Sequence, residues 1–483
     1  MTWPLVALLA LYPLWWALGL AVLIFPIMAV PMAYALLRQH RQGIGLRLPP
    51  YFVLWLIFLA AVVIGVGALS SDPVGVVDGG AGDRILGVAF RLIEYASLTV
   101  LLLYAGNLPA TGGMSQRRLV GLLAWLFAVT VAGGLLGTFA GEFGFTSPVE
   151  LLLPHGVRSK GFVQSLVHPY AAQIMDLVGD PQPRPAAPWG YTNTWGNNFC
   201  LLVVWFVVAV WSYPTRRRTK VLAAGTLLAA IVPVVHSLNR GLWIGLGVAV
   251  AYVALRQALR GRFAVLIAGA AAVAVLGVAF VASPLGDVVN RRLENGKSNG
   301  VRMFLTERAI TGMQQSPVIG YGSTRNTVGG RQSITVGESK GCERCGNFTV
   351  GGNGQLWQLL FAHGIVGTVS YLGFFGLGLW RFRRDSTPIG IAGSAAIVGT
   401  LVAMFWYNAL VTPLAFTFLA YALLWRNWLQ SPRALRGSGR FAPFTPRASA
   451  ASPERALRGS GRFAPFTPRA SAQPNNNTSG VPG

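Results

Sequence analysis

Long apolar stretches recur along most of the chain, and no other feature of the sequence constrains its fold so strongly. Stretches of about 18–22 residues alternate with short polar or basic segments as far as residue 428. A helix needs ~20 apolar residues to cross a bilayer core. Charged residues make up only 11% of the chain, less than half of their usual share. The sequence therefore predicts an all-α polytopic membrane protein, because a membrane barrel would show alternating ten-residue segments instead.

The apolar stretches predict eleven or twelve transmembrane helices. The first stretch, residues 3–50, leaves the count open, because it is too long for one straight helix and contains Pro13, Pro26 and Pro31. It has no charged segment before it and no cleavage site, so we do not interpret it as a signal peptide. The approximate bounds of the other stretches are 51–70, 84–105, 119–140, 196–213, 219–236, 241–258, 263–283, 355–380, 388–407 and 409–428.

Basic residues gather on one side of the predicted helices. When the helices alternate in direction, this side receives 24 of the 39 Lys and Arg residues but only Asp385 and Glu454 among the 15 acidic residues. Basic loops mark the cytoplasmic side of a membrane protein. We therefore expect the C-terminus in the cytoplasm and assign the net charge of +24 to topology. Nucleic acid is not an expected partner.

The opposite side receives two long outer loops, at about 141–195 and 284–354, which we expect to contain short helices. Apolar spacing over residues 161–179 predicts an interfacial helix, which a proline-rich strip follows. Residues 301–315 predict a second helix, which ends before Ser316 and Pro317. Loops of this length usually carry function or are disordered. Residues 1–429 are predicted to form one transmembrane domain.

Residues 430–483 are predicted to form a disordered basic cytoplasmic tail. The segment RALRGSGRFAPFTPRASA occurs at 433–450 and again at 455–472, a direct repeat with a period of 22 residues. Its content of Arg, Pro, Gly and Ser is typical of disordered segments. Two interpretations stay open. The tail is either solvated and without specific function, or it contacts anionic lipid, at ~1 kcal/mol per basic residue near the surface.

The three cysteines do not form a disulfide framework. Cys200 lies in an apolar stretch, where it is interpreted as a packing residue. Cys342 and Cys345 form the segment CERC in the second outer loop. A local disulfide, a free pair and a metal site all remain open there. Two sulfurs without a nearby histidine or second cysteine pair make a poor zinc site, and a disulfide is favoured outside the cytoplasm.

The chain contains no P-loop, HExxH, GxSxG or EF-hand pattern. We therefore expect no metal and no other cofactor. Ionisable residues are rare in the predicted helices, whereas ion-coupled transporters usually carry several intramembrane carboxylates. Arg91 and Glu94 are spaced to pair on one face of the third helix. His363 lies inside a later helix and is interpreted as a packed residue.

Basic residues are also frequent in the outer loops, where such a surplus suits an anionic ligand. Arginine binds phosphate through a planar, bidentate fork and stays charged. Most of these residues are interpreted as solvated or as lipid-headgroup contacts. Arg240 differs, because it lies in a very tight turn on the predicted outer side, whereas basic residues usually gather on the cytoplasmic side. We therefore expect Arg240 to be functional. The set comprises Arg158, Lys160, Arg184, Arg240, Arg291, Arg292, Lys297, Arg302, Arg308, Arg325, Arg331, Lys340 and Arg344.

Four segments between about residues 190 and 380 form an ordered set. GYTNTWGNN at 190–198 leads into an apolar stretch, and SLNRGLW at 237–243 has the pattern Ser-x-x-Arg-Gly-x-Trp. VRMFLTERAITGMQQSPVIGYG at 301–322 places an arginine before Pro-x-x-Gly-x-Gly. GGNGQLWQLLFAHGIVG at 351–367 places an asparagine before Gly-x-x-Gly. In this order, and on the outer side, these segments resemble the O-antigen ligase and O-antigen polymerase superfamily.

The resemblance implies a metal-independent glycosyltransferase of the bacterial inner membrane. Such an enzyme moves a glycan from a polyprenyl-diphosphate carrier to an acceptor hydroxyl outside the cytoplasm, and thereby polymerises or ligates a cell-surface polysaccharide. The arginines of the family correspond to Arg240 and Arg302. Fixed cations aimed at a diphosphate leaving group would stabilise the charge that develops on it. The implied partners are the lipid-linked glycan, an acceptor glycan or lipid-glycan, and membrane lipids.

The predicted site contains catalytic and substrate-binding candidates. A histidine of the family corresponds to Gly352, so the resemblance does not provide the general base. Glu307 ranks first for this role, because it shares a predicted helix with Arg302, and His155, His168 and His236 are the other outer candidates. The catalytic candidates are Arg240, Arg302 and Glu307, and the substrate-binding candidates are Trp243, Arg308, Asn353 and Trp357.

Two alternative functions remain from the sequence. A transporter or flippase of a lipid-linked anionic glycan would use the same arginines only to bind the headgroup. A peptidoglycan-type polymerase usually relies on an outer-loop aspartate, for which Asp287 is the one obvious counterpart, in surroundings that do not match. Ligase and polymerase share the donor chemistry, so the sequence does not separate them.

Overall fold

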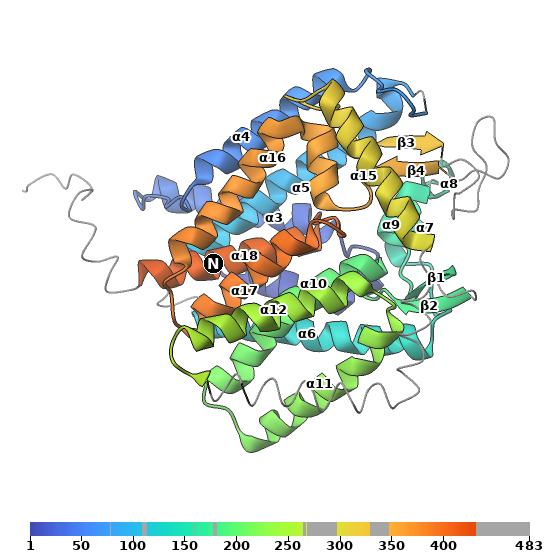
Figure 1. Ribbon diagram of the computed structural model, residues 1–483. Coiled ribbons are helices and arrows are strands. Elements are labelled where there is room, and N and C mark those ends of the chain that lie inside the picture. The colour runs from blue at the N-terminus through green and yellow to red at the C-terminus, as the bar shows by residue number, and fades with distance from the viewer. Residues whose placement is uncertain are drawn as a thin grey trace, which may run out of the picture. The chain divides into compact units, whose positions relative to one another are not determined.

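A computed structural model describes residues 1–77, 79–108, 114–159, 161–176, 181–263, 267, 297–328 and 347–430 (Figure 1). The chain divides into two compact units, Met1–Leu435 and Arg436–Gly483. The described residues all belong to the first unit. The predicted tail at 430–483, the pair Cys342 and Cys345, and almost all of the predicted helix at 263–283 lie outside them.

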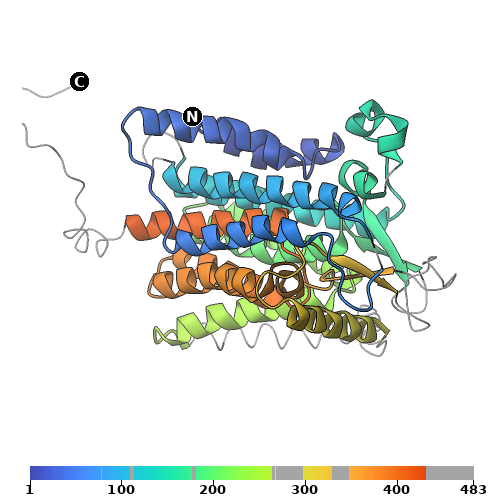
Figure 2. The same cartoon turned by 90° about the horizontal axis from the view of Figure 1, so that it is seen from above.

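The first unit is a bundle of long helices that run side by side (Figure 2). Among the described residues, six helices are long and apolar enough to cross a membrane. The protein is therefore helical and of the multi-pass membrane type, while the count of eleven or twelve helices stays a prediction. The six lie within α5 (Ala81–Asn107), α6 (Gln116–Phe139), α10 (Thr192–Val207) with its continuation η2 (Val208–Ser212), α11 (Arg217–His236), α12 (Arg240–Ala258) and α16 (Gln355–Phe382).

The first apolar stretch folds back on itself. α1 (Trp3–Ala10) and α2 (Tyr12–Ala17) lead to a break, after which α3 (Ile24–Arg41) returns beside α1. Gly19 lies in the break with φ +80°, and a Cβ there would be 2.2 Å from the Ser147 Oγ, so the chain requires glycine at this point. Residues 3–41 thus form a helical hairpin, which favours the higher of the two predicted helix counts.

The centre of the bundle is formed by α18 (Thr412–Leu429), which is buried from Thr412 to Arg426. A helix that is apolar on all sides is stable when other helices surround it. α17 (Pro388–Ala403) and α16 pack against it, and α4 (Phe52–Ile64), extended by η1 (Gly65–Ala68), adds Trp55. The ring of Trp55 contacts Phe418 and Phe374 at centroid distances of 4.9 and 5.7 Å.

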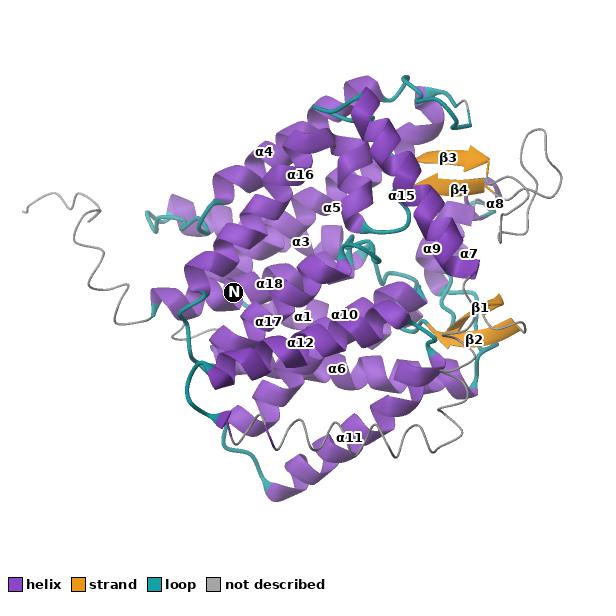
Figure 3. Cartoon of the chain, viewed as in Figure 1, coloured by secondary structure: helices purple, strands orange, loops and turns teal. Residues whose placement is uncertain are grey.

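The two ends of the bundle differ in composition. At one end, arginine side chains join neighbouring loops: Arg256 donates to the Asp385 carbonyl at 2.6 Å, and Arg426 donates to the Met114 carbonyl at 2.5 Å. The other end carries the strands and short helices (Figure 3). The elements at this end are α7 (Pro148–Leu152), α8 (His155–Arg158), α9 (Gly161–Val167), β1 (Ala172–Asp176), β2 (Pro181–Pro185), β3 (Arg325–Val328) and β4 (Asn347–Val350), together with the longer helix α15 (Lys297–Gln315).

The all-α expectation is wrong in one respect, because the described residues include two small antiparallel sheets. β1 pairs with β2, and β3 pairs with β4, with Arg325 opposite Val350. Both pairs lie at the end of the bundle, outside the long helices. Each strand of a two-stranded sheet is an edge strand. The prolines of β2 are therefore tolerated, whereas in a central strand a proline would remove a hydrogen bond because it has no N–H group. The Val77 N–H donates to the Asn326 carbonyl of β3 at 2.7 Å.

The helix expected over residues 161–179 is also wrong in its length. α9 ends at Val167, and the chain then forms β1, in which Gln173 lies opposite Arg184. Pro169 explains the early end, because a proline disfavours helical geometry at the preceding residue and cannot donate within a helix. The second expected helix of the outer loops ends at Gln315, directly before Ser316 and Pro317 as predicted.

Arg91 and Glu94 do not pair, although their spacing on α5 allows it. The Arg91 guanidinium lies 3.5 Å from the Thr324 hydroxyl, and the amide oxygen of Gln358, in its satisfied orientation, accepts from it at 2.8 Å. Both Glu94 carboxyl oxygens are buried without a hydrogen-bond partner among the described residues. The expectation fails because neighbouring segments supply closer partners for Arg91. His363 is fully buried and its ring lies 5.7 Å from that of Phe58, as expected of a packed residue.

Candidate functional site

Arg240 is the first residue of α12, at the corner between α11 and α12. α11 ends at His236, and Leu238 forms the corner with φ +51°, a left-handed conformation that is uncommon for a branched residue. The Ser237 hydroxyl closes the end of α11 by donating to the Val234 carbonyl at 2.7 Å. The N-terminal end of a helix carries a partial positive charge, which favours anions. An arginine at that end adds a full positive charge to the same point, an arrangement that suits a bound anion.

Asn239, which precedes Arg240, is held from two sides. Its Oδ1 accepts a 2.5 Å hydrogen bond from the Tyr407 hydroxyl. Its Nδ2 donates to the Thr192 carbonyl and to Asn193 Oδ1, both at 3.4 Å, at the start of α10. Asn239 and Tyr407 are 3% and 2% exposed. Because both side chains are buried and bonded, they fix the position from which Arg240 begins its helix.

Arg302 comes to the same place from α15. Burial lowers the pKa of the Arg302 guanidinium, and among the smaller causes the charge of Arg240 lowers it and Tyr407 opposes this. The guanidinium stays charged, because the ordinary pKa of arginine is above 12. Arg240, Arg302 and Tyr407 thus lie within electrostatic range of one another. We call these three residues together with Asn239 the arginine site.

Asn353 anchors the helix that carries Arg302. Its Nδ2 donates to the Thr306 hydroxyl at 2.9 Å and to the Arg302 carbonyl at 3.3 Å. It is 8% exposed and lies just before α16. Asn353 therefore acts on the backbone of α15, which is a positioning role. The sequence predicted that it binds substrate, and no contact of the described residues tests that role.

Tyr407 lies in the loop between α17 and α18, which the sequence analysis did not single out. The loop is tied to the start of α16: the Gln355 N–H donates to the Tyr407 carbonyl at 2.8 Å, and the Ala409 N–H donates to Gln355 Oε1 at 2.9 Å. Burial raises the pKa of the Tyr407 hydroxyl well above its usual value, while the cations Arg302 and Arg184 act against this. Tyr407 therefore stays protonated and serves as a hydrogen-bond donor.

Arg184 is a third arginine near Tyr407. It is 5% exposed, and its Nε donates to the Ser237 carbonyl at 2.7 Å, while its Nη1 lies 3.3 Å from the Met175 sulfur. β2 thereby holds the corner that precedes Arg240. The sequence pattern predicted a solvated side chain or a lipid-headgroup contact at Arg184, and that interpretation is wrong, because the side chain is buried. In the sequence, only the position of Arg184 in a proline-rich strip could have indicated this structural role.

The glycine motif at 317–322 is explained by close backbone approach. Gly320 and Gly322 have φ of +64° and +69°, and a Cβ on either would meet backbone atoms at 2.6 and 2.0 Å, from α16 and from Gly65. The N–H groups of Tyr321 and Gly322 donate to the Phe361 and Ala362 carbonyls at 3.1 and 2.7 Å. The motif therefore docks the end of α15 onto α16, which fixes the helix that carries Arg302.

Arg325 holds the next segment in a buried ion-pair network. It is 2% exposed, its Nε donates to Asp72 Oδ1 at 2.8 Å, and its Nη2 donates to the Ser71 carbonyl at 2.9 Å. Arg84 binds the same carboxylate at 2.7 Å. Burial raises the pKa of Asp72, but the hydrogen bonds from Arg84 and Arg325 outweigh it, so the net pKa is lowered. Arg325 thus has a structural role.

The other predicted site residues do not all converge on the arginine site. Glu307 is exposed, and at about 100° per residue it lies about 140° around α15 from Arg302, on another face. Arg308 packs over the ring of Phe304, 5.3 Å from its centroid. Both indole N–H groups donate to backbone carbonyls: Trp243 to Val234 at 3.0 Å, and Trp357 to Phe405 at 3.1 Å. These contacts position α12 and α16.

The remaining outer candidates are dispersed. His168 Nδ1 is 2.8 Å from Glu150 Oε2, and His155 is exposed on α8. Within the described ranges, no group of three His, Cys, Asp or Glu side chains is arranged to hold a metal ion. Asp287 lies outside those ranges. Comparison of the chain with protein-family models and with curated proteins gave no match.

Proposed function

We propose that this protein is a membrane glycosyltransferase that moves a glycan from a polyprenyl-diphosphate carrier to an acceptor hydroxyl. The observation that carries the proposal is the arginine site. Arg240 and Arg302, from sequence-distant helices, lie within electrostatic range of each other at the end of the bundle that bears the short elements. Arginine binds phosphate through a planar, bidentate fork and stays charged. A diphosphate with two negatively charged phosphoryl groups matches such a pair.

In the proposed reaction, the acceptor oxygen forms a bond to the anomeric carbon while the bond from that carbon to the diphosphate oxygen breaks. The polyprenyl diphosphate leaves with the electron pair, and the acceptor proton passes to the leaving diphosphate or to water. Arg240, Arg302 and the N-terminal end of α12 stabilise the charge that grows on the leaving group. Glu307 is the first candidate for a base on the protein, and it projects from another face of α15 than Arg302 does.

The membrane arrangement is part of the proposal. We infer eleven or twelve transmembrane helices in a bacterial inner membrane, with the basic end of the bundle and the C-terminus in the cytoplasm. The support is the charge rule, because Arg117, Arg256 and Arg426 all belong to that end. The arginine site then faces the outside, where polymerisation or ligation of a cell-surface polysaccharide takes place. The two outer loops carry its supporting strands and helices.

The test is conservative replacement of the two arginines. The protein, reconstituted in vesicles with an undecaprenyl-diphosphate-linked oligosaccharide, should lengthen or transfer the glycan. We expect Arg240→Lys and Arg302→Lys each to lose at least tenfold of this activity, because lysine lacks the planar fork. Arg256→Lys is the matched control, at the opposite end of α12. Full activity in both site variants would refute the proposal.

A transporter or flippase of a lipid-linked anionic glycan is the second candidate, and the same arginines favour it. The two functions differ in a covalent product. Purified protein with donor and acceptor produces a longer or transferred glycan only if it is a transferase. Translocation of unchanged lipid-linked glycan across the vesicle membrane, without any new glycosidic bond, would identify the transporter.

A further inference from the structure

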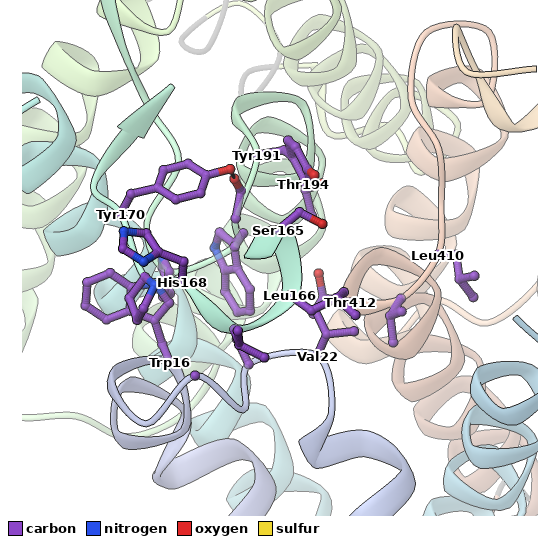
Figure 4. A pocket seen from close by; sticks show the side chains of 18 of the residues that line it. Trp16, Val22, Ser165, Leu166, His168, Tyr170, Tyr191, Thr194, Leu410 and Thr412 are labelled. Carbon is purple, nitrogen blue, oxygen red and sulfur yellow. Dashed lines mark hydrogen bonds between the residues drawn. The ribbon is translucent and has the colours of Figure 1, made fainter. Parts of the chain in front are cut away.

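A cavity of about 240 Å³, shown in Figure 4, is lined in part by the start of α10, the helix that contacts Asn239 of the arginine site. Its walls come from the break between α2 and α3, from α5, α9 and α10, and from residues 410–412. At ~30 Å³ per molecule, the volume equals about eight waters. It is below the range of 300–1,000 Å³ that is common for drug-sized ligands, so it suits a single small ring.

Aromatic side chains form one part of the cavity wall. The rings of Tyr12 and Trp189 lie 4.5 Å apart between centroids, and those of Phe90 and Phe162 lie 5.6 Å apart. Trp16 adds a further indole. Such rings offer flat apolar faces at a low cost in conformational entropy, and they suit ligands that have an apolar face and polar edges.

Polar groups lie on the other part of the wall. Figure 4 shows Ser165, Tyr191 and Thr194 close together, on the side opposite Trp16. His168 also lines the cavity and is held by Glu150 at 2.8 Å. The Tyr170 hydroxyl is occupied, since it donates to the Gly190 carbonyl. A few polar groups that converge on an apolar cavity are typical of a specific ligand site.

The cavity and the arginine site share a wall. Asn193 contacts Asn239 of the arginine site, and the next residue, Thr194, lines the cavity. The loop before α18 also contributes to both sites, because Tyr407 belongs to the arginine site and residues 410–412 line the cavity. The Asn198 amide joins the two segments by donating to the Thr412 hydroxyl at 2.7 Å.

We propose that this cavity binds a neutral sugar ring. A pyranose has an apolar face of C–H groups, which matches the aromatic wall, and hydroxyls at its edge, which match the polar side. A prenyl or acyl chain would offer no hydrogen bond to the hydroxyls of Tyr191 and Thr194. A charged sugar fits less well, because the lining residues of the described chain include no lysine, arginine, aspartate or glutamate. The ring's role as part of the acceptor glycan rests on the proposed transferase function.

The experiment measures binding directly. The protein in lipid nanodiscs, free of sugar detergents, is mixed with maltose, cellobiose, lactose or chitobiose, and saturation-transfer NMR reports contact. We expect a signal from at least one disaccharide, and a fall of at least fivefold in Tyr191→Ala and in Thr194→Val. Tyr191 is 44% exposed, so its replacement should leave the fold intact. Tyr34→Ala, 59% exposed and distant from the cavity lining, is the control.

The outcomes separate this proposal from the transferase proposal. Arg240→Ala should keep the disaccharide signal while it loses transfer, because the two sites bind different chemical groups. Sugar binding that depends on Tyr191, in a protein without any transferase activity, would support the sugar site and remove its role as acceptor site. No signal, a signal unchanged by both cavity variants, or a Tyr191-dependent signal from farnesol alone would overturn the sugar site.

Discussion

Gly241 shows how little space surrounds the arginine site. A Cβ at this position would lie 2.8 Å from the Tyr407 hydroxyl and 2.9 Å from its ring. Gly241→Ala therefore pushes Tyr407 away from Asn239, and such overpacking costs about 1–3 kcal/mol. We expect a lower melting temperature and at least a tenfold loss of glycan transfer, measured in the same vesicle assay.

Gly247→Ala is the control for this change. Gly247 lies on the same helix, and a Cβ there would meet nothing within 4 Å. Alanine is favoured over glycine in a helix by up to ~1 kcal/mol, so this variant should be as stable as the natural chain or more stable. Equal behaviour of the two variants would show that the space around Tyr407 is not limiting.

Tyr407→Phe tests the hydrogen bond itself. The variant keeps the ring but leaves the buried Oδ1 of Asn239 without its 2.5 Å donor. An unsatisfied buried acceptor costs about 1–3 kcal/mol, which thermal unfolding should detect. Tyr34→Phe, at an exposed position, serves as the reference. An unchanged melting temperature in Tyr407→Phe would mean that the bond contributes nothing to the corner before Arg240.

The residues of the arginine site were only partly predictable. Arg240 and Arg302 are visible in the sequence, because each stands in an outer segment with a recognisable pattern. Tyr407 has no such signal, since it is one aromatic residue near the end of an apolar stretch. Its role follows from the pairing of its loop with the start of α16, which involves residues distant in sequence. Arg184 was missed for the same reason.

At the scale of elements, the long apolar helices were predictable and the strands were not. Apolar length predicts a membrane helix nearly by itself, because the bilayer leaves the backbone few alternatives. β1 pairs with the proline-rich segment β2, in which Arg184 lies opposite Gln173. The sequence of these strands shows no alternation of apolar and polar residues that would have predicted the pairing. The break after α2 was suggested by prolines, but Gly19 and its contact with Ser147 determine where it lies.

The ion-pair network that joins the segment after η1 to β3 predicts a pH-dependent stability. The pKa of Asp72 is lower in the folded protein than in the unfolded chain, where it is about 4. The ion pairs of Asp72 therefore add to the free energy of unfolding above about pH 4, and this stabilisation is lost as the pH falls through the pKa of the folded state. Asp72→Asn should lower the free energy of unfolding by roughly 1–3 kcal/mol at neutral pH, because Arg325 loses a charged partner.

The measurement for Asp72 is thermal unfolding of the two proteins between pH 3 and pH 8. Their difference should be constant over the neutral range and should shrink below about pH 4, where the natural carboxylate is protonated as well. Glu142→Gln, an exposed carboxylate at the same end of the bundle, should show no comparable difference. If the natural protein and Asp72→Asn differed in melting temperature at pH 3 as much as at neutral pH, the ion pairs of Asp72 would be excluded as the cause.

At the scale of the whole molecule, the proposed function depends on which end of the bundle faces the outside. Cysteine labelling decides this. In a variant without Cys200, Cys342 and Cys345, single cysteines are placed at Gln42, in the segment after α3, and at Glu142, in the segment after α6. Both positions are exposed. They lie at opposite ends of the bundle, since Arg47 pairs with Asn107 at the far end of α5, while Phe145 pairs with Pro169 near the strands.

A membrane-impermeant maleimide applied to intact spheroplasts should label Glu142→Cys at once and Gln42→Cys only after permeabilisation. The reason is the charge rule: the end with Arg38, Arg41 and Arg47 should remain in the cytoplasm. The arginine site then opens to the compartment where lipid-linked glycans are polymerised or ligated, and the sugar cavity opens beside it. The reverse labelling pattern would place Arg240, Arg302 and the cavity on the cytoplasmic side, and both the transferase and the acceptor role of the cavity would have to be abandoned.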